Sequence, residues 1–233
     1  MCNSACLEFG CANLHPNEVT GKSVIEVGSI DVNGSLRTIV NTLAPGSYLG
    51  VDIRSGPGVD LICNATELLT RFGRECFEVL ICTEVLEHIY NWRQAVSNFK
   101  HILRPQGILL ITTRSKGFGL HEYPADFWRF EVEDMQAIFS DFEIEVISRD
   151  HLGPGVFIKA RKPDTFQERD LTNQPLYSII KDRRTTIITR ADWCWFLIRC
   201  GIWYRTASII QRLISRILPA SWKRIIRERV RRT

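Results

Sequence analysis

The stretch FEVLICTEVLEHIYNWRQAVSNFKHILRPQGILLITT, residues 77–113, indicates the fold class more directly than any other part of the chain. It opens with a β-rich apolar run at 77–83 and closes with another at 107–113, whose continuous apolar character suits a strand buried on both faces. Between them, residues 92–103 carry apolar side chains at the spacing of one helical face, and the Pro-Gln-Gly at 105–107 ends that helix. The order strand, helix, strand predicts two neighbours in a parallel α/β sheet.

The same alternation extends through residues 22–162. The expected strands are 23–28, 47–53, 59–64, 77–83 and 107–113, and the expected helices are 35–43, 66–72, 92–103 and 132–139. Two further strand-like runs, 142–149 and 155–161, are joined by a connection so short that only an antiparallel hairpin fits. The sequence therefore predicts a Rossmann-like three-layer α/β sandwich with a seven-stranded, mostly parallel sheet and an antiparallel terminal hairpin.

Charge divides the 233 residues into two dissimilar parts. The formal net charge is +4, but residues 1–162 hold 15 Lys/Arg against 20 Asp/Glu, whereas residues 163–233 hold 15 against 6. We therefore expect four segments. They are an N-terminal helical segment at 1–21, the α/β domain at 22–162, a linker at 163–190, and a basic, Trp-rich, amphipathic helical tail at 191–233.

Several classes of protein are disfavoured by the sequence. No apolar run reaches the roughly 18 to 20 residues that a membrane-spanning helix needs. No basic patch followed by an apolar run marks a secretory signal, which favours a cytoplasmic protein. The spacing of Cys2, Cys6 and Cys11 matches neither a paired zinc motif nor a common iron–sulfur motif, so no metal site is predicted.

A ligand loop is expected after the first strand. Gly28 follows Glu26 at the end of VIEVG, and glycine lets a bound molecule approach the backbone near a helix N-terminus. Asp52 ends the second strand, about where an open α/β sheet places an acid against a ribose. The pair predicts a nucleoside-type ligand. The loop lacks G-x-G-x-x-G, which disfavours a dinucleotide oxidoreductase.

With TEVLEH at 83–88 and the turn at 104–107, residues 22–162 resemble the class I S-adenosylmethionine-dependent methyltransferases, particularly the broad type 11 group. The resemblance implies that S-adenosyl-L-methionine is the cofactor. It implies a donor site made of Glu26, Gly28, Ser29, Asp31, Asn33, Asp52, Ile53, Asn64, Ala65 and Thr83. The first loop is longer and more polar than the family's, which makes Asp31 and Asn33 the candidates at the methionine end. Asn64 stands where the family commonly has an acid.

The acceptor side is expected at the carboxyl edge of the sheet, where open α/β folds bind ligands. His88 follows the fourth strand, and the loop HEYPADFWRF at 121–130 gathers ionisable and aromatic groups suited to a binding site. The predicted catalytic residues are His121, His88 and Asp126, and the predicted substrate residues are Tyr123, Trp128 and Arg129. Two alternatives stay open: His88 fixing its loop, and an ordinary ion pair between Asp126 and Arg129.

These features predict an enzyme that transfers a methyl group to a small molecule, a glycan or a lipid-linked precursor. The alternative is a non-catalytic module of the same fold that binds S-adenosylmethionine or another nucleoside and acts through its tail.

The tail alternates large apolar residues with arginines at helical spacing. Apolar side chains opposite Arg are typical of a helix at an anionic membrane surface, which would make the protein peripheral at the membrane. Packing of the helix against the α/β domain or a second subunit is the competing interpretation. Nucleic acid is disfavoured because the basic residues are interleaved with aliphatic ones and the α/β domain is acidic.

Overall fold

In the computed structural model of this chain, residues 3–121 and 125–201 are described. The chain divides into a compact unit that ends at Ile187 and a second unit that begins at Ile188.

The first unit is built on a seven-stranded sheet with the order β3-β2-β1-β4-β5-β8-β7. The strands are β1 Ser23–Val27, β2 Ser47–Asp52, β3 Leu61–Ile62, β4 Phe77–Thr83, β5 Leu103–Arg114, β7 Glu143–Arg149 and β8 Gly155–Arg161. Strands β3, β2, β1, β4 and β5 run parallel to one another, whereas β8 pairs antiparallel with both β5 and β7. The predicted fold class, including the antiparallel hairpin, is confirmed.

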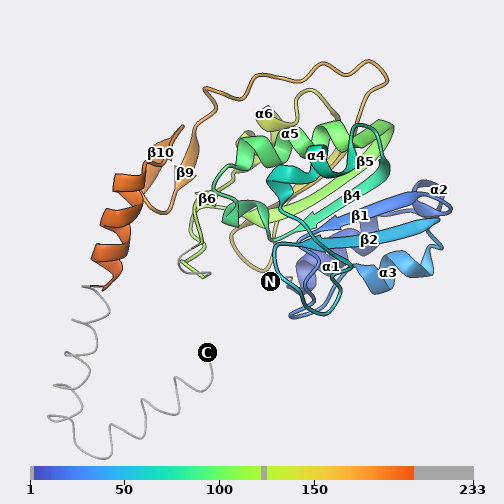
Figure 1. The fold of residues 1–233 in the computed structure, drawn as a ribbon, viewed down its shortest axis with the longest axis horizontal. Helices are drawn as coiled ribbons and strands as arrows, with labels where there is room; N and C mark the ends of the chain where they lie inside the picture. The colour runs from blue at the N-terminus through green and yellow to red at the C-terminus, as the bar shows by residue number, and fades with distance from the viewer. Residues whose placement is uncertain (1–2, 122–124, 202–233) are drawn as a thin grey trace, which may run out of the picture. The chain divides into compact units, whose positions relative to one another are not determined.

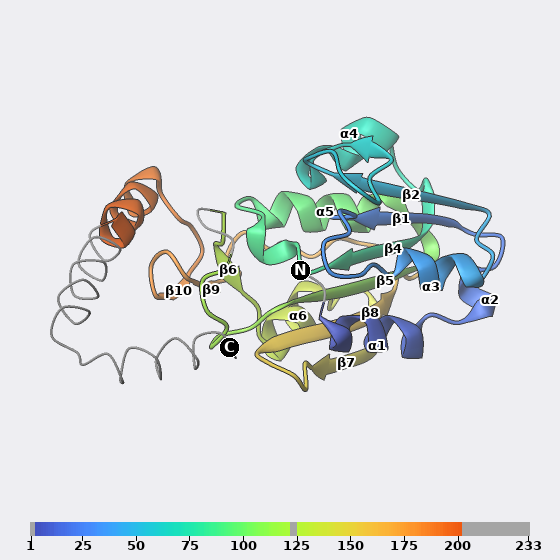
Figure 2. The ribbon, with the colours of Figure 1, turned by 90° about the horizontal axis from the view of Figure 1, so that it is seen from below.

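Helices cover both faces of this sheet. They are α1 Ser4–Asn13, α2 Pro16–Val19, α3 Arg37–Thr42, α4 Leu68–Phe72, α5 Trp92–Ile102 and α6 Val132–Ile138. Figures 1 and 2 show α4, α5 and α6 on one face and α1 and α3 on the other. The apolar stripe of α5 is fully buried at Trp92, Val96 and Phe99, as its helical spacing predicts. The Phe9 ring of α1 packs 5.2 Å from that of Phe157 in β8.

A second, three-stranded antiparallel sheet has the order β10-β9-β6. It consists of β6 Trp128–Arg129, β9 Leu176–Ser178 and β10 Arg183–Thr185. The structure differs here from the predicted linker at 163–190, since that segment supplies two strands and buries Leu176 and Ser178 completely. Strands of three residues in a polar stretch give little periodic signal, and β6, one of the two partners of β9, lies far away in sequence.

In the second unit, residues 190–201 form a helix. The rest of the predicted amphipathic tail, 202–233, lies outside the described residues. Among the described helices, none is both long enough and apolar enough to cross a membrane.

Candidate functional site

Gly28 makes the turn at the end of β1, and two observations explain why glycine stands there. Its φ is +81°, a conformation that side chains with a Cβ adopt only with strain. A Cβ at this position would also lie 2.0 Å from Cγ2 of Val85, which follows β4. The Gly28 amide donates to the Val51 carbonyl at 2.8 Å, which ties the turn to β2. The loop backbone therefore lies close against the segment that follows β4.

Glu26 is the acid of the same strand, and it is almost fully buried. The Tyr48 hydroxyl donates to its Oε2 at 2.8 Å, and the Ser35 hydroxyl donates to Oε1 at 3.3 Å. Burial raises the pKa of Glu26 to about 7, although these two hydrogen bonds and the charge of Arg37 oppose the rise. The site thus holds a buried carboxyl group, and a cationic group of a bound ligand would favour its ionised form.

A cavity of about 440 Å³ opens at the carboxyl edge of the sheet. Its lining includes these predicted donor-site residues: Glu26, Gly28, Ser29, Asp52, Ile53, Asn64, Ala65 and Thr83. Of the two loop candidates for the methionine end, neither lines it. The lining passes instead through Ile30, Val32 and Gly34, because Asp31 Oδ1 turns back to accept the Gly34 amide at 2.8 Å.

Polar groups at the strand ends are fixed by local hydrogen bonds. Asp52 ends β2 and its Oδ1 accepts the Arg54 amide at 3.1 Å, which holds the carboxylate at the cavity wall. Asn64 Oδ1 accepts the Thr66 amide at 3.0 Å and so caps the turn that carries Ala65. This capping role is a local reason for asparagine where the resembling family commonly has an acid. Ser29 is buried, and its hydroxyl has no hydrogen-bond partner within the described part of the chain.

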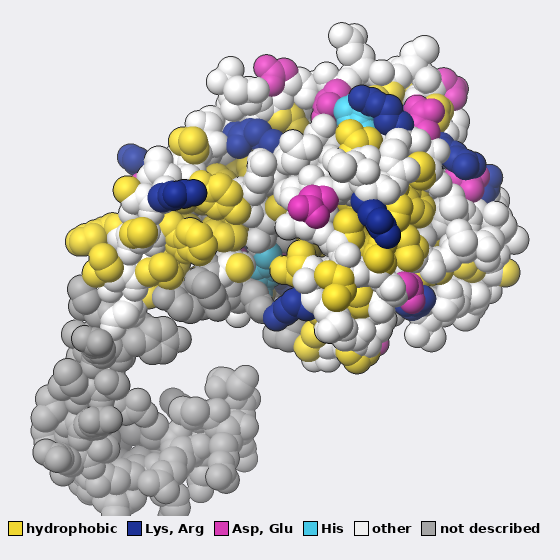
Figure 3. All heavy atoms as spheres, in the orientation of Figure 1, with side chains coloured by type: hydrophobic (Ala, Val, Ile, Leu, Met, Phe, Trp, Pro, Cys, Tyr) yellow, Lys and Arg dark blue, Asp and Glu magenta, His cyan; other side chains and the backbone are white. Residues whose placement is uncertain are grey.

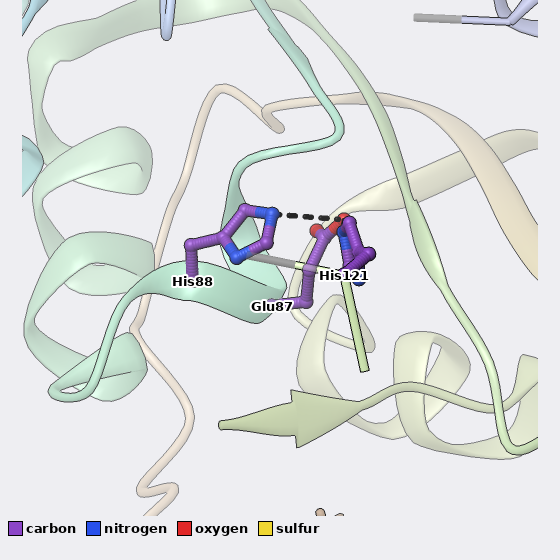
Figure 4. Close-up of side chains that lie close together, drawn as sticks. All are labelled: Glu87, His88 and His121. Carbon is purple, nitrogen blue, oxygen red and sulfur yellow. Dashed lines mark ion pairs between the residues drawn. The ribbon is translucent and has the colours of Figure 1, made fainter. Parts of the chain in front are cut away.

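The acceptor side brings the three predicted catalytic residues together. His88 lines the cavity, and its Nδ1 lies 2.7 Å from the Ala125 carbonyl oxygen. The His121 ring packs 4.6 Å from the His88 ring, and its Nδ1 lies 3.0 Å from Asp126 Oδ2. Glu87 lies between the two histidines, as Figure 4 shows, with Oε1 3.8 Å from Nε2 of each.

The HEYPADFWRF loop gives Asp126 and Arg129 a structural ion pair. Both are fully buried, and the guanidinium contacts the two carboxylate oxygens at 2.5 and 2.8 Å. Burial would raise the pKa of Asp126, but hydrogen bonds from Arg129 and His121 hold it well below its ordinary value. Arg129 also donates to the Phe118 and Gly119 carbonyls, so it braces the loop.

This burial corrects two expected substrate contacts. Arg129 and Trp128 do not line the cavity; the Trp128 indole is buried and donates to the Tyr90 carbonyl at 3.1 Å. Both residues lie in β6, which pairs with β9, and no periodic pattern signals that pairing in advance. Tyr123 lies outside the described residues.

Two glutamates of the segment after β4 were not selected from the sequence. Glu84 has φ +57°, lines the cavity and forms a buried ion pair with Arg114. Glu87 is fully buried, and its Oε2 accepts from the Thr113 hydroxyl at 2.8 Å. The available signal was the TEVLEH string itself, which places two acids and a histidine directly after a strand. A strained backbone at such a position is common in functional sites.

Comparison with known proteins identifies the domain. Residues 7–111 match the family model described as a methyltransferase domain. A ubiquinone biosynthesis O-methyltransferase of Coxiella burnetii (strain Dugway 5J108-111) is 24% identical over 117 residues, which cover 50% of this chain and 46% of that protein. A phthiotriol/phenolphthiotriol dimycocerosates methyltransferase of Mycobacterium ulcerans is 31% identical over 120 residues, which cover 47% and 44%. The chain thus spans less than half the length of these curated relatives.

Solved structures share the fold at low sequence identity. The 1,6-didemethyltoxoflavin-N1-methyltransferase of Burkholderia thailandensis, with bound S-adenosylhomocysteine, matches with a TM-score of 0.55 at 16% identity, over 70% of this chain and 80% of that one. A putative methyltransferase of Haloferax volcanii, in complex with the Trm112 activator, matches with a TM-score of 0.56 at 12% identity, over 68% and 89%. Residues 7–111 therefore resemble a methyltransferase domain, and the chain shares its fold with a methyltransferase that binds S-adenosylhomocysteine.

Proposed function

We propose that this protein transfers the methyl group of S-adenosylmethionine to a hydroxyl group of a small-molecule, glycan or lipid-linked acceptor. The observation that carries the proposal is the cavity at the carboxyl edge of the sheet. Gly28 and Asp52 belong to its lining, and so does His88. Predicted donor-site residues and His88, which contacts the His121 ring, therefore adjoin one cavity.

Methyl transfer requires few chemical groups from the protein. The acceptor oxygen attacks the methyl carbon, the C–S bond breaks, and its electron pair stays on sulfur as the sulfonium becomes a neutral thioether. The protein must align the two reactants and assist loss of the hydroxyl proton. We assign that assistance to His121 and His88, with Asp126 orienting the His121 ring. This acceptor-side cluster favours an enzyme over a module that only binds the cofactor.

An oxygen acceptor agrees with the distant relatives, one of which is named as an O-methyltransferase. The second named relative is, by its name, a methyltransferase of phthiotriol and phenolphthiotriol dimycocerosates. These names motivate the choice of acceptors to test, since each protein is matched over less than half its length.

The test is transfer of a labelled methyl group from S-adenosylmethionine to lipid and glycan extracts. We expect labelled product with the wild-type chain and at least a tenfold loss with His121→Asn, because general acid–base assistance typically contributes 10²- to 10⁴-fold. The matched control is His151→Asn, which changes an exposed histidine paired only with exposed Glu8. Label transfer that is unaffected by His121→Asn would contradict the assigned role.

We further propose that the C-terminal segment contacts anionic membrane surfaces. The helix at 190–201 exposes Trp195 and Ile198, and hydrophobic side chains gather over it in Figure 3. Residues 163–233 carry a net charge of +9. Exposed apolar groups together with basic charge favour binding to an interface that contains anionic lipids. A lipid-linked acceptor would then be reached at the surface where it resides.

A further inference from the structure

Glu87, His88 and His121 form a cluster whose free ligand atoms converge. Glu87 and His88 belong to a short 3-10 turn at Leu86–His88, directly after β4, and His121 lies in the segment after β5. One potential ligand atom from each residue lies within 4.8 Å of the others. Figure 4 shows the two rings and the carboxylate gathered at one point, although they come from two separate segments.

Each of the three side chains is oriented by an outer partner. The Ala125 carbonyl oxygen lies 2.7 Å from His88 Nδ1 and can only accept, so Nδ1 carries a proton, and Nε2 is the nitrogen of this ring that can bind a metal ion. On His121, Nδ1 lies 3.0 Å from an oxygen of Asp126. Histidines that bind metals almost always turn their other nitrogen toward such a carbonyl or carboxylate.

Glu87 supplies the anionic member of the cluster. Its side chain is fully buried, and Oε2 accepts from the Thr113 hydroxyl at 2.8 Å. The other oxygen, Oε1, has no hydrogen-bond partner among residues 3–121 and 125–201. A buried carboxylate oxygen without a partner is costly unless a donor or cation faces it.

The neighbouring guanidinium groups are already engaged. Arg114, which follows Thr113, pairs with Glu84 and Asp150. Arg129 pairs with Asp126. A cationic partner for Glu87 would therefore be a protonated histidine or a bound cation. A protonated histidine would hold its imidazolium Nε2 3.8 Å from Glu87 Oε1, which is beyond hydrogen-bond distance.

The spacing of the three ligand atoms fits a bound cation better than it fits a protonated histidine. Ligand atoms bonded to one metal at about 2.0–2.2 Å lie roughly 3 to 4 Å apart, and Glu87 Oε1 is 3.8 Å from Nε2 of both histidines. Two imidazoles and one carboxylate suit zinc, iron, cobalt or manganese, whereas magnesium and calcium prefer sites made of oxygen atoms alone.

We propose that Glu87, His88 and His121 bind one divalent transition-metal ion at the acceptor side of the cofactor cavity. The sequence alone predicted no metal site, because the outermost two of its three ligands stand 34 residues apart and the set matches no short motif. Three protein ligands leave coordination positions open, as in catalytic metal sites.

The metal would deepen the proposed function, on which this inference rests. His88 lines the cavity, so a cation on its Nε2 would adjoin the bound cofactor. An acceptor hydroxyl that coordinates the metal loses its proton to solvent more readily, and the resulting oxyanion attacks the methyl carbon while the C–S pair stays on sulfur. The two histidines then act as ligands, and Asp126 is a positioning residue for His121.

The test is metal content and affinity of the full chain. Protein stripped with chelator is titrated with Zn²⁺, passed through a desalting column and analysed by elemental mass spectrometry. We expect about one zinc per chain for wild type and for the control His151→Asn. We expect at least a tenfold weaker affinity for Glu87→Gln and for His121→Asn, two near-isosteric changes on separate segments. Zinc retained equally by all four proteins, or by none, would overturn the inference.

The spectrum of bound Co²⁺ distinguishes a metal ion held by this cluster from one held by cysteines. Co²⁺ bound by nitrogen and oxygen gives visible ligand-field bands without the intense near-ultraviolet band that thiolate ligation produces. We expect that spectrum in the wild-type chain and its loss in Glu87→Gln, while thermal unfolding shows that the variant remains folded. A thiolate band that survives in Glu87→Gln would contradict the assignment.

Cofactor binding separates failure of this inference from failure of the proposed function. We expect the metal-free wild type and Glu87→Gln to bind S-adenosylhomocysteine, since Gly28 and Asp52 lie on other strands. Binding of S-adenosylhomocysteine without any zinc binding would overturn the metal site and leave the proposed function standing. Absence of S-adenosylhomocysteine binding in both metal states would overturn the proposed function itself.

Discussion

At the scale of single residues, Gly28 has little freedom to change. Its positive φ and the 2.0 Å approach to Val85 both exclude a Cβ. Gly28→Ala should lower the free energy of unfolding by about 2 kcal/mol or more, since backbone strain and overpacking each cost about 1–3 kcal/mol. It should also abolish cofactor binding, because relief of the clash moves the loop. Urea unfolding and calorimetry measure the two effects.

The matched control is Gly153→Ala. Gly153 has no atom within 4 Å of an added Cβ and no positive φ, so the change should stay within about 0.5 kcal/mol. Equal unfolding curves for the two alanine variants would contradict the steric account of Gly28.

Glu26 makes stability depend on pH. Its pKa is raised from 4.5 to about 7 by burial, so the folded state favours the protonated acid. That stabilisation is fully present below pH 4.5 and is lost as the pH rises toward 7, an effect of about 3 kcal/mol. Without cofactor, Glu26→Gln should therefore be more stable than wild type at pH 8 and should lose the pH dependence over this window.

Chemical unfolding at pH 5 and pH 8 measures the effect, with Glu8→Gln as an exposed control on α1 that should track wild type. A Glu26→Gln variant with the same pH dependence as wild type would show that Glu26 is ionised throughout. We also expect Glu26→Gln to bind S-adenosylmethionine more weakly, because the change removes a carboxylate of the cavity lining that could face the cofactor's ammonium group.

At the scale of elements, the strand and helix pattern was predictable, whereas the small sheet was not. The buried runs at β4 and β5 and the stripe on α5 signal their structure locally, because periodicity follows from burial. β9 and β10 are three residues each; they pair with each other, and β9 also pairs with β6, about 50 residues away. Trp128 and Arg129, which form β6, are buried and do not line the cavity.

The functional site, like the fold, has parts that were predictable from the sequence and parts that were not. Donor-site residues at strand ends, such as Gly28 and Asp52, were predictable because parallel strands deliver their carboxyl ends to one edge. The outward turn of Asp31 depends on a hydrogen bond to Gly34 inside an unusually long loop. The cluster at Glu87 depends on how the segment after β5 folds back on the segment after β4. Neither arrangement has a periodic signature.

Helix α1 packs on the sheet behind the cofactor loop, so it should stabilise the whole domain. Phe9 is buried against Phe157, and Phe9→Ala should cost about 3 kcal/mol in free energy of unfolding. Glu8→Ala on the exposed side of the same helix should cost less than about 0.5 kcal/mol. Urea titration of both variants measures this. Similar losses in the two variants would mean that α1 contributes little through its packed face.

At the scale of the whole molecule, the two ends of the chain differ in charge and in proposed task. We expect the full chain to float with vesicles that contain anionic phospholipid at low salt and to remain behind with neutral vesicles. Raising the salt concentration should weaken binding because it screens the basic residues. Trp195→Ala should reduce flotation, and recovery of the wild-type chain in the lipid-free fraction at low salt would contradict the membrane proposal.

The cavity at the carboxyl edge of the sheet should bind S-adenosylmethionine, and titration calorimetry with S-adenosylhomocysteine measures this binding. We expect saturable binding with one site per chain. We expect roughly tenfold or weaker affinity for Asp52→Asn, which would remove a charge-assisted hydrogen bond to the ribose, and unchanged affinity for the exposed control Asp164→Asn. No binding by the folded wild-type chain, or equal affinity in all three proteins, would contradict this expectation.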